Sequence, residues 1–432
     1  MDSSALMTDH YELTMLQAAL HSGTAHRKCV FEAFARKLPD GRRYGVVAGT
    51  GRLLELLKNF TFNEEEIDFL RKNKVVNEET LEYLKDYKFS GNIYGYPEGE
   101  LYFPNSPILI VEGTFAEACI IETLVLSVLN HDSAIASAAA RMVGAAADRP
   151  CIEMGTRRTH EESAVAAARA AAIVGFATTS NLEAGRRYGI ATQGTSAHSF
   201  TLLHDSEEEA FKAQIESLGK KTTLLVDTYN VENAVHTAVK LAGPELGGVR
   251  LDSGDLASQA KSVRKLLDSL GATKARIVVT SDLDEYAIAA LQVAPVDGYG
   301  VGTQLVTGSG HPTAAMVYKL VSHEDESGIQ VPVAKKASGK KSIGGRKYAY
   351  RELANDIAQT EVITTSPDYE ATDNERPILV QLVKNGKINY EYTGETGVAN
   401  AQKHFKKAFA ELPEKGLSLQ KGDPIINTVF KD

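Results

Sequence analysis

The segment GGVRLDSGDL places charged side chains at the end of a short apolar run. Arg250 and Asp252 alternate with Val249 and Leu251, so in a β-strand the two charged residues share one face. The chain then bends at Gly254 and enters an amphipathic segment. A guanidinium beside carboxylates at the carboxyl end of a strand is typical of α/β active sites. The pattern indicates a polyanionic, magnesium-bound substrate, and the alternative is an ion pair that closes the rim of a barrel.

Two arginines, Arg157 and Arg158, lie between an apolar run and an Ala-rich helical segment. Thr159 and Glu162 have the spacing of a capping box, which predicts Thr159 as the N-cap of that helix. Because the free N–H groups and the dipole of a helix N-terminus favour anions, the arginines indicate a phosphate site. The alternative is that both arginines form surface pairs with Glu161 and Glu162.

Three further segments place polar or small residues after apolar runs. GTSAHSF surrounds His198 with small residues that leave room for a ligand, although a lone histidine is more often structural. TSDLDE adds Ser281 and Asp282 at the end of the next run. VDGYGVGTQL supplies Gly300 and Gly302, whose backbone N–H groups can approach a phosphate closely. Their late position agrees with the phosphate sites at the last strands of α/β barrels.

A regular alternation of apolar runs and helical patterns between residues 130 and 310 must position these candidates. The apolar runs span 151–155, 173–181, 190–198, 222–230, 248–255, 276–282 and 296–303, and the helical patterns span 161–172, 206–218, 232–241 and 256–270. Such repeated strand–helix units predict a parallel sheet that is buried on both faces. About seven units, without a glycine-rich dinucleotide fingerprint, favour an irregular seven-stranded α/β barrel (TIM-like) over an open nucleotide-binding sheet.

The flanking segments are richer in turns. Strands are expected at 27–36, 90–99, 348–353 and 378–386, and helices are expected around Tyr11 and near 401–412. We expect residues 1–125 and 326–432 to form one accessory α/β sandwich domain beside a barrel domain of residues 126–325. The Gly- and Ser-rich basic run at 335–347 predicts a flexible loop. Tyr11, taken alone, is expected to be a half-buried core aromatic.

Composition narrows the class of protein. A net charge of −9 over 432 residues argues against nucleic acid as the main ligand. Three widely spaced cysteines fit reduced thiols and offer neither a disulfide framework nor zinc-ligand spacing. We find neither a signal peptide nor an apolar run of membrane-spanning length. A cytoplasmic protein without a membrane partner is expected.

Six segments taken together resemble nicotinate phosphoribosyltransferase. They are MTDHYELTM, EMGTRRTHEE, TTSNLEAG, GTSAHSF, RLDSGDL and YGVGTQL, and the resemblance runs from residue 7 to at least 320. It implies a type II phosphoribosyltransferase fold, with an irregular barrel of about seven strands and a sandwich built from both termini. The implied reaction converts nicotinate and phosphoribosyl pyrophosphate, with ATP hydrolysis, to nicotinate mononucleotide and pyrophosphate in NAD salvage. It also implies Mg²⁺ and a homodimer whose active sites lie at the subunit interface.

The resemblance also assigns roles to individual residues. His198 matches a histidine that ATP phosphorylates transiently, Arg250 and Asp252 match the pair beside the pyridine ring, and Arg157 matches an arginine near the pyrophosphate. The other matched positions are Ser281, Asp282, Gly300, Gly302 and Thr303 around the ribose and its 5′-phosphate, Thr179, Ser180 and Asn181 near the base, and Tyr11, which stacks on the pyridine from the neighbouring subunit.

Some assignments stay open at this point. Met154 stands where the family often has phenylalanine on the other face of the pyridine, although a thioether can also pack on an aromatic ring. Either Asp252 or Asp282 is a candidate ligand for Mg²⁺. The alternative functions are a phosphoribosyltransferase for nicotinamide or another pyridine, and a non-catalytic metabolite-binding oligomer. An aldolase is disfavoured because no strand end carries a Schiff-base lysine.

Overall fold

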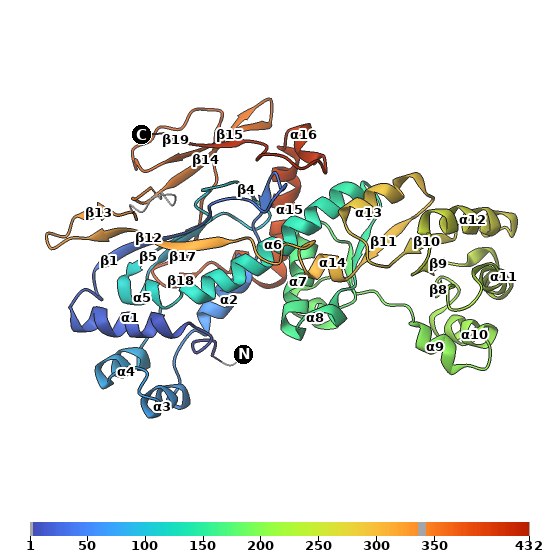
Figure 1. The fold of residues 1–432 in the computed structure, drawn as a ribbon, viewed down its shortest axis with the longest axis horizontal. Helices are drawn as coiled ribbons and strands as arrows, with labels where there is room; N and C mark the ends of the chain where they lie inside the picture. The colour runs from blue at the N-terminus through green and yellow to red at the C-terminus, as the bar shows by residue number, and fades with distance from the viewer. Residues whose placement is uncertain (1–2, 336–342, 432) are drawn as a thin grey trace. The chain divides into compact units, whose positions relative to one another are not determined.

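A computed structural model describes residues 3–335 and 343–431. The chain divides into two compact units, which we call the terminal unit (residues 1–137 and 311–432) and the central unit (residues 138–310) (Figure 1). The sequence predicts domain boundaries after residues 125 and 325. The first of these positions lies inside helix α6 (Glu122–Ala146). The second follows β12 (Met316–Glu324), which pairs with β1 (Lys28–Ala35) inside the terminal unit.

The terminal unit takes its elements from both ends of the chain. Its helices besides α6 are α1 (His10–His21), α2 (Thr50–Lys58), α3 (Glu64–Lys72), α4 (Glu78–Lys85), α5 (Phe115–Cys119), η4 (Tyr390–Tyr392), α15 (Gly394–Ala410) and α16 (Glu414–Leu417). Its strands besides β1 and β12 are β2 (Gly45–Val46), β3 (Asn92–Gly95), β4 (Leu101–Tyr102), β5 (Leu109–Thr114), β13 (Gln330–Pro332), β14 (Tyr348–Ala354), β15 (Ile357–Thr364), β16 (Glu375–Pro377), β17 (Val380–Lys384), β18 (Lys387–Ile388) and β19 (Asn427–Lys431).

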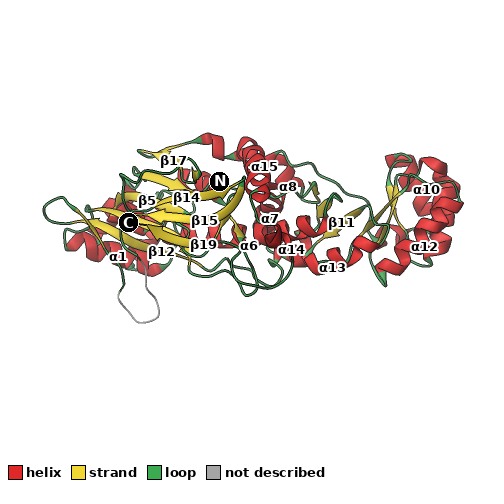
Figure 2. Ribbon diagram, turned by 90° about the horizontal axis from the view of Figure 1, so that it is seen from above, coloured by secondary structure: helices red, strands yellow, loops and turns green. Residues whose placement is uncertain are grey.

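A seven-stranded antiparallel sheet forms the centre of this unit, in the order β13-β12-β1-β5-β3-β17-β18. A second sheet has the order β16-β14-β15-β19, and Figure 2 shows the strands of both sheets together. Strand β1 is buried on both faces. Phe31 packs into the main core, whereas its neighbour Val30 packs with Ile110 and Val321 in a smaller cluster. This alternation follows from the two-residue period of a strand.

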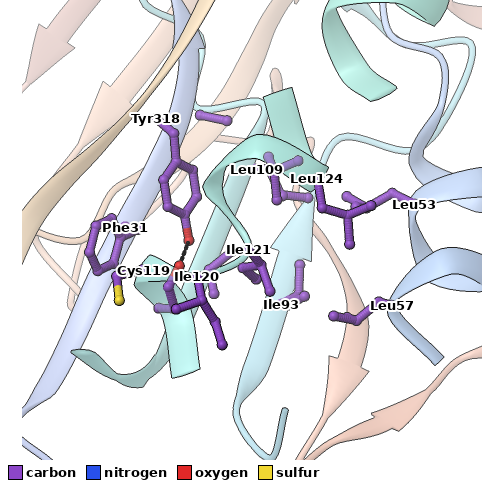
Figure 3. Close-up of a cluster of buried hydrophobic side chains, with 14 of the residues drawn as sticks. Phe31, Leu53, Leu57, Ile93, Leu109, Cys119, Ile120, Ile121, Leu124 and Tyr318 are labelled. Carbon is purple, nitrogen blue, oxygen red and sulfur yellow. Dashed lines mark hydrogen bonds between the residues drawn. The ribbon is translucent and has the colours of Figure 1, made fainter. Parts of the chain in front are cut away.

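The main core of the terminal unit joins helices to the seven-stranded sheet. Figure 3 shows Phe31, Leu109 and Tyr318 from the sheet beside Leu53 and Leu124 from helices α2 and α6. The ring of Phe31 stacks on that of Tyr318, with ring centroids 4.9 Å apart. The Tyr318 hydroxyl donates to the carbonyl of Ala118 at 3.0 Å, which satisfies its polar atom within the core.

The stretch Phe115–Ala146, which includes α5 and α6, is long and apolar enough by length and composition to cross a membrane. The expectation that no stretch approaches that length was therefore wrong. However, 67% of the most apolar window is buried inside the structure, as in the core helix of a soluble protein. Its composition thus reflects packing against protein.

The central unit alternates strands and helices as the sequence predicts. Its strands are β6 (Cys151–Glu153), β7 (Thr178–Thr179), β8 (Thr223–Leu225), β9 (Gly248–Leu251), β10 (Arg276–Val279) and β11 (Gly298–Val301). Its helices are η1 (Thr156–Arg158), α7 (Glu161–Ile173), α8 (Leu182–Tyr188), α9 (His198–Leu203), α10 (Glu207–Leu218), α11 (Val231–Ala242), η2 (Gly243–Glu245), α12 (Leu256–Ser269), α13 (Glu285–Ala290), η3 (Leu291–Val293) and α14 (Thr303–Val306).

These strands form one parallel sheet in the order β7-β6-β11-β10-β9-β8, which confirms the α/β class. The described residues do not form the expected closed barrel of seven strands. The run 190–198 contributes a single isolated bridge, between Thr192 and Thr179, and no strand pairing within the described residues joins β7 to β8. This run, IATQGTSAH, has Ile190 as its only large apolar residue, so it lacks the apolar side chains that hold a strand in a sheet.

Two local predictions need comment. Helix α7 begins at Glu161 with His160 as its N-cap, so the predicted capping box of Thr159 and Glu162 was wrong. Thr159 instead ends the short helix η1, and its backbone is extended. The predicted loop 335–347 falls mostly on residues 336–342, which lie outside the described residues. At its end, Lys347 is buried and forms an ion pair with Glu32.

Candidate active site

The carboxyl ends of the six parallel strands gather the predicted residues of the central unit at one edge of the sheet. Met154 follows β6, Asp252 follows β9, Asp282 follows β10, and Gly302 follows β11. Because neighbouring parallel strands run in the same direction, residues that follow them lie at the same edge. Two backbone hydrogen bonds link these ends: Met154 N–H donates to Val301 at 2.8 Å, and Thr280 N–H donates to Leu251 at 2.8 Å.

Arg250 lies on β9 and is held by one hydrogen bond. Its Nη1 donates to the Thr195 hydroxyl at 2.7 Å, while its buried Nε has no hydrogen-bond partner among the described residues. Burial lowers the pKa of Arg250. The carboxylates of Asp252 and Asp227 oppose that change, whereas the positive charge of Arg157 reinforces it. A guanidinium with an unpaired buried donor can bind an anion without first breaking an ion pair.

Asp252 is fixed by its neighbours on both sides. Its Oδ1 accepts a hydrogen bond from the Thr280 hydroxyl, and its backbone N–H donates to Asp227 Oδ2 at 2.8 Å. The Ser253 hydroxyl also donates to Asp227 Oδ2, at 2.9 Å. No ion pair joins Asp252 to Arg250 within the described part of the chain. The ion pair between Arg250 and Asp252, which was the alternative interpretation of this segment, is therefore not formed by the described residues.

His198 lies at the start of α9 between two carboxylates. Its Nε2 is 3.8 Å from Asp227 Oδ1 and 3.8 Å from Asp252 Oδ2. Its Nδ1 lies 3.1 Å from the Thr228 hydroxyl. The side chain is 40% exposed, so the ring is partly open to solvent. This arrangement orients one ring nitrogen toward the acidic pair and leaves the other on Thr228.

Met154 and Gly300 form one wall of the site. A Cβ added at Gly300 would lie 2.6 Å from Met154 Sδ and 2.5 Å from Thr280 Cγ2. These distances are shorter than any ordinary contact, so the residue at position 300 must be glycine while Met154 and Thr280 stay in place. Gly302 is less crowded, since its added Cβ would lie 3.3 Å from the Met154 carbonyl oxygen.

Thr179, Ser180 and Asn181 form the turn after β7. Asn181 caps helix α8 by accepting from the Ala184 N–H at 2.8 Å, and its Nδ2 donates to the Thr156 hydroxyl at 3.3 Å. The Ser180 hydroxyl lies 3.5 Å from the same Thr156 oxygen. The turn is thereby tied to the helix η1 that carries Arg157.

Arg157 and Arg158 are exposed on η1 and do not form the surface pairs that were the alternative reading. Glu162 pairs instead with Arg187, at 2.9 Å. No described residue forms a hydrogen bond or an ion pair with the Arg157 side chain. Its charge nevertheless acts on Arg250, since it contributes to the lowered pKa of that residue.

The remaining predicted residues differ in their surroundings. Ser281 has a φ of 139°, a strained value for a residue with a side chain, and Asp282 beside it is exposed. Thr303 begins the four-residue helix α14. Tyr11 lies on α1 in the terminal unit with 48% exposure. Burial and the nearby carboxylates of Glu122 and Glu12 raise the pKa of Tyr11.

Sequence reasoning missed Asp227, Thr228, Thr195 and Thr280. Asp227 follows the apolar run TTLLV just as Asp252 follows GVRL, so the same rule of an acid after a strand identifies both. The side chain of Asp227 is only 3% exposed, and its Oδ1 has no hydrogen-bond partner among the described residues. The three threonines gave no such signal, because an isolated threonine is common in every class of structure.

A search of the described residues finds no group of three or more His, Cys, Asp or Glu side chains arranged to hold a metal ion. The two carboxylates beside His198 are nevertheless suitable donors for a cation that arrives with its own ligands. Mg²⁺ in particular is commonly held by one or two carboxylates together with substrate phosphates. The orphaned oxygen of Asp227 fits that arrangement.

Comparison with known proteins relates this geometry to a family. Residues 6–130 match the N-terminal domain of nicotinate phosphoribosyltransferase, and residues 135–309 match the C-terminal domain of quinolinate phosphoribosyl transferase. A nicotinate phosphoribosyltransferase of Mycobacterium tuberculosis is 52% identical over 99% of this chain and 95% of its own length. One of Bacillus subtilis is 41% identical over 81% of this chain and 73% of its own length.

The chain belongs to the nicotinate phosphoribosyltransferase family. It is accordingly an enzyme of this family, and the prediction made from the six segments is confirmed. The crystal structure of human nicotinic acid phosphoribosyltransferase has the same fold, with a TM-score of 0.83, 23% identity and 98% coverage of both chains. A nicotinate-nucleotide pyrophosphorylase from Pyrococcus furiosus gives a TM-score of 0.76 at 25% identity, covering 94% of this chain and 96% of that one.

Proposed function

We propose that the chain converts nicotinate and phosphoribosyl pyrophosphate to nicotinate mononucleotide and pyrophosphate, a step of NAD salvage. The observation that carries the proposal is 52% identity to a nicotinate phosphoribosyltransferase over nearly the whole chain. The site supports it, because cationic Arg250 and Arg157 lie near a pair of carboxylates at one sheet edge. A nicotinamide-specific enzyme would have less use for a desolvated guanidinium beside the base.

The transfer needs no protein nucleophile. The pyridine nitrogen forms a bond to the anomeric carbon of the ribose, while the bond from that carbon to the pyrophosphate oxygen breaks and its electron pair leaves with pyrophosphate. Positive charge grows on the ribose ring and negative charge grows on the leaving group. Positioning and electrostatic stabilisation are therefore the main contributions of the protein. Arg157 is placed to stabilise the departing pyrophosphate.

Arg250 is our candidate for binding the nicotinate carboxylate. The planar fork of a guanidinium matches a carboxylate in a bidentate arrangement. Thr195 occupies Nη1 at 2.7 Å and fixes the orientation of the fork, and the buried Nε has no hydrogen-bond partner among the described residues. Asp252, held by Thr280, is in turn our candidate for orienting the ribose hydroxyls.

His198 is our candidate for the residue that ATP phosphorylates. Thr228 lies at hydrogen-bond distance from Nδ1, so Nε2 is the nitrogen that attacks the γ-phosphorus. The bond from that phosphorus to the β–γ bridging oxygen breaks, ADP leaves, and water later releases the phosphoryl group as phosphate. Bound Mg²⁺ would neutralise phosphate charge, and Asp227 and Asp252 would hold it.

The other parts of the proposal follow the family resemblance. Ser281, Asp282, Gly300, Gly302 and Thr303 bind the ribose and its 5′-phosphate, and Met154, Thr179, Ser180 and Asn181 surround the base. Tyr11 stacks on the base from the other subunit of a cytoplasmic homodimer. We also propose that the segment of Thr192 takes the seventh position of an irregular barrel, and its bridge to Thr179 supports this.

A direct assay tests the function. Purified protein with phosphoribosyl pyrophosphate, Mg²⁺ and nicotinate should release pyrophosphate, ATP should stimulate the release, and nicotinamide should support much less. Absence of nicotinate-dependent pyrophosphate release would contradict the proposed activity. In parallel, His198→Ala should abolish labelling by γ-³²P-ATP and the stimulation by ATP. Undiminished stimulation would remove His198 from its role.

A further inference from the structure

Glu153 is a buried carboxylate that the reaction described above does not use. It is the last residue of β6, directly before Met154, and it is 1% exposed. A carboxylate rarely occupies such a position, because loss of hydration disfavours its charged form. Burial accordingly raises the pKa of Glu153, while the Thr179 hydroxyl and the Gly155 backbone counteract that change.

The two carboxylate oxygens of Glu153 tie together two turns. One oxygen, Oε1, accepts from the backbone N–H of Gly155, and the other, Oε2, accepts from the Thr179 hydroxyl. The Thr179 oxygen itself accepts the backbone N–H of Asn181 at 3.0 Å. The Glu153 carbonyl also accepts the Ser180 N–H at 2.8 Å. One residue thereby closes the first turn after β6 and the first turn after β7.

The first turn is crowded around this carboxylate. A Cβ added at Gly155 would lie 3.1 Å from Glu153 Oε1 and 2.2 Å from Val306 Cγ1, so the backbone at Gly155 has little freedom. The first turn leads to Arg157 and the second to Asn181, and Thr156 bonds to Asn181 across them. If this buried group served stability alone, an apolar side chain of similar volume would serve as well or better.

We propose that Glu153 is a positioning residue for the transferase reaction, which holds the turn of Arg157 and the turn of Asn181 in register at the rim of the substrate site. The inference rests on the proposed function, since it assumes that both turns bind substrate. Glu153 touches no reacting atom in this scheme. It acts through Gly155 and Thr179, so its loss should weaken substrate binding more than turnover.

Steady-state kinetics of Glu153→Ala and Glu153→Gln test the proposal. The alanine variant should raise the KM for nicotinate or phosphoribosyl pyrophosphate roughly 10- to 100-fold, with a smaller change in kcat. The glutamine variant should stay within about fivefold of wild type, because its amide oxygen can accept from Gly155 while its NH₂ donates to Thr179. An unchanged KM in the alanine variant would overturn the proposal.

Glu361 provides a matched control in the terminal unit. It is 0% exposed and bonds to Tyr96, Ser106 and Arg351, none of which belongs to the site. Glu361→Gln should lower stability and leave both KM values at wild-type level. If it changed the KM values as much as Glu153→Ala does, Glu153 would have only a structural role.

Hydrogen exchange gives a second test that needs no activity. The amides of Gly155 and Asn181 should exchange at least tenfold faster in Glu153→Ala than in wild type, while amides in β9 should be unaffected. Unchanged exchange at both amides would refute the proposal even if the enzyme is active. Faster exchange in the alanine variant, together with a wild-type protein that has no nicotinate-dependent activity, would instead discard the proposed function and keep the positioning of the two turns. If the alanine variant does not fold, the same measurements on Glu153→Asp, whose shorter side chain cannot reach both partners, decide the matter.

Discussion

Fully buried Glu100, in the terminal unit, accepts hydrogen bonds from Arg376 and His404, each at 2.9 Å. In the central unit, by contrast, the buried Asp227 Oδ1 has no hydrogen-bond partner among the described residues. Glu100 belongs to what we call the terminal network: Glu100, Arg351, Glu361, Arg376, His404 and Glu411. Each carboxylate in it lies within 4 Å of a guanidinium. Arginine and histidine donors lower the pKa of Glu100 well below its ordinary value, although burial opposes them.

The edge of the central sheet differs in its ion pairs and not in its orphaned atoms, since Arg351, Arg376 and Glu411 also have buried atoms without a hydrogen-bond partner among the described residues. Arg250 has no carboxylate within ion-pair distance in the described structure, and the effect of burial outweighs that of the nearby carboxylates, so the pKa of Arg250 is lowered. Buried charges that are paired hold a fold together, whereas charges left unpaired at strand ends mark a site that awaits a charged ligand. The comparison predicts that substitutions in the terminal network change stability, and substitutions at the sheet edge change catalysis.

The largest effect is expected for Arg351→Met. It leaves the carboxylates of Glu100 and Glu361 buried without this partner, and such a loss typically costs about 3–5 kcal/mol. Urea unfolding followed by circular dichroism measures it, since the chain has no tryptophan for fluorescence. The folded fraction should keep its kcat/KM within about twofold. A severe loss of catalysis in well-folded protein would break the comparison.

Arg250→Gln should have the reverse profile. We expect kcat/KM for nicotinate to fall about 100-fold, equivalent to roughly 3 kcal/mol of transition-state stabilisation. The melting temperature should change by no more than about 2 °C, because the wild-type guanidinium is desolvated without a partner carboxylate. Turnover on nicotinamide, measured in the same assay, should change much less. An unaltered preference for nicotinate would refute the assignment of Arg250 to the carboxylate.

The buried ion pair of Asp132, also in the terminal unit, extends the comparison to the pH dependence of stability. Burial raises its pKa, but Arg52 and His131 outweigh that effect and lower the pKa from its ordinary 3.8 to about 2. Asp132→Asn should therefore lose about 2 kcal/mol of unfolding free energy at neutral pH. Because the folded pKa lies below the unfolded one, this difference should persist above pH 4 and shrink as the pH falls from 4 toward 2. Urea unfolding at several pH values checks it, and a constant difference would contradict it.

The smallest effect is expected for Thr280→Val, which removes the hydroxyl that donates to Asp252. Loss of one hydrogen bond of this kind costs about 1 kcal/mol, so kcat/KM for phosphoribosyl pyrophosphate should fall about fivefold. Thr222→Val is the control, since it removes a hydroxyl that bonds to Gln214 at 3.0 Å. Equal kinetics for the two variants would show that Asp252 needs no support from Thr280.

Much of the central unit could be predicted from sequence because apolar runs such as RIVV and TLLV specify buried parallel strands. The strand expected at 190–198 was not predicted correctly. This run lies where the alternation of strands and helices expects a strand, but its residues are mostly small and polar, and they form a single bridge. The capping box at Thr159 failed because η1 uses that residue to end its own turn. In these cases tertiary contacts outweighed the local pattern.

Site residues could be predicted where the residue types within one segment indicate chemistry. They were missed where only a contact between distant segments identifies them. Arg250, Asp252 and His198 stood out within their segments, and the structure brings them together. Thr195 and Thr228 became visible only through hydrogen bonds to those residues from distant parts of the chain. Glu153 gave no functional signal in sequence, because it lies within the apolar run CIEM and not after it, as Asp227 and Asp252 do.

The pairing of β1 with β12 has a consequence for synthesis on the ribosome. Ala35, at the end of β1, pairs with Met316, so one edge of β1 stays open until about 280 more residues have been made. At about 5–20 residues per second, that interval lasts roughly 15 to 60 s. During it, β5 can pair with β1 and β3, but the outer edges of β1 and β3 still lack β12 and β17, while all strands of the central sheet emerge and can pair. The open edges of β1 and β3 therefore wait longer for their partners than any strand of the central sheet does.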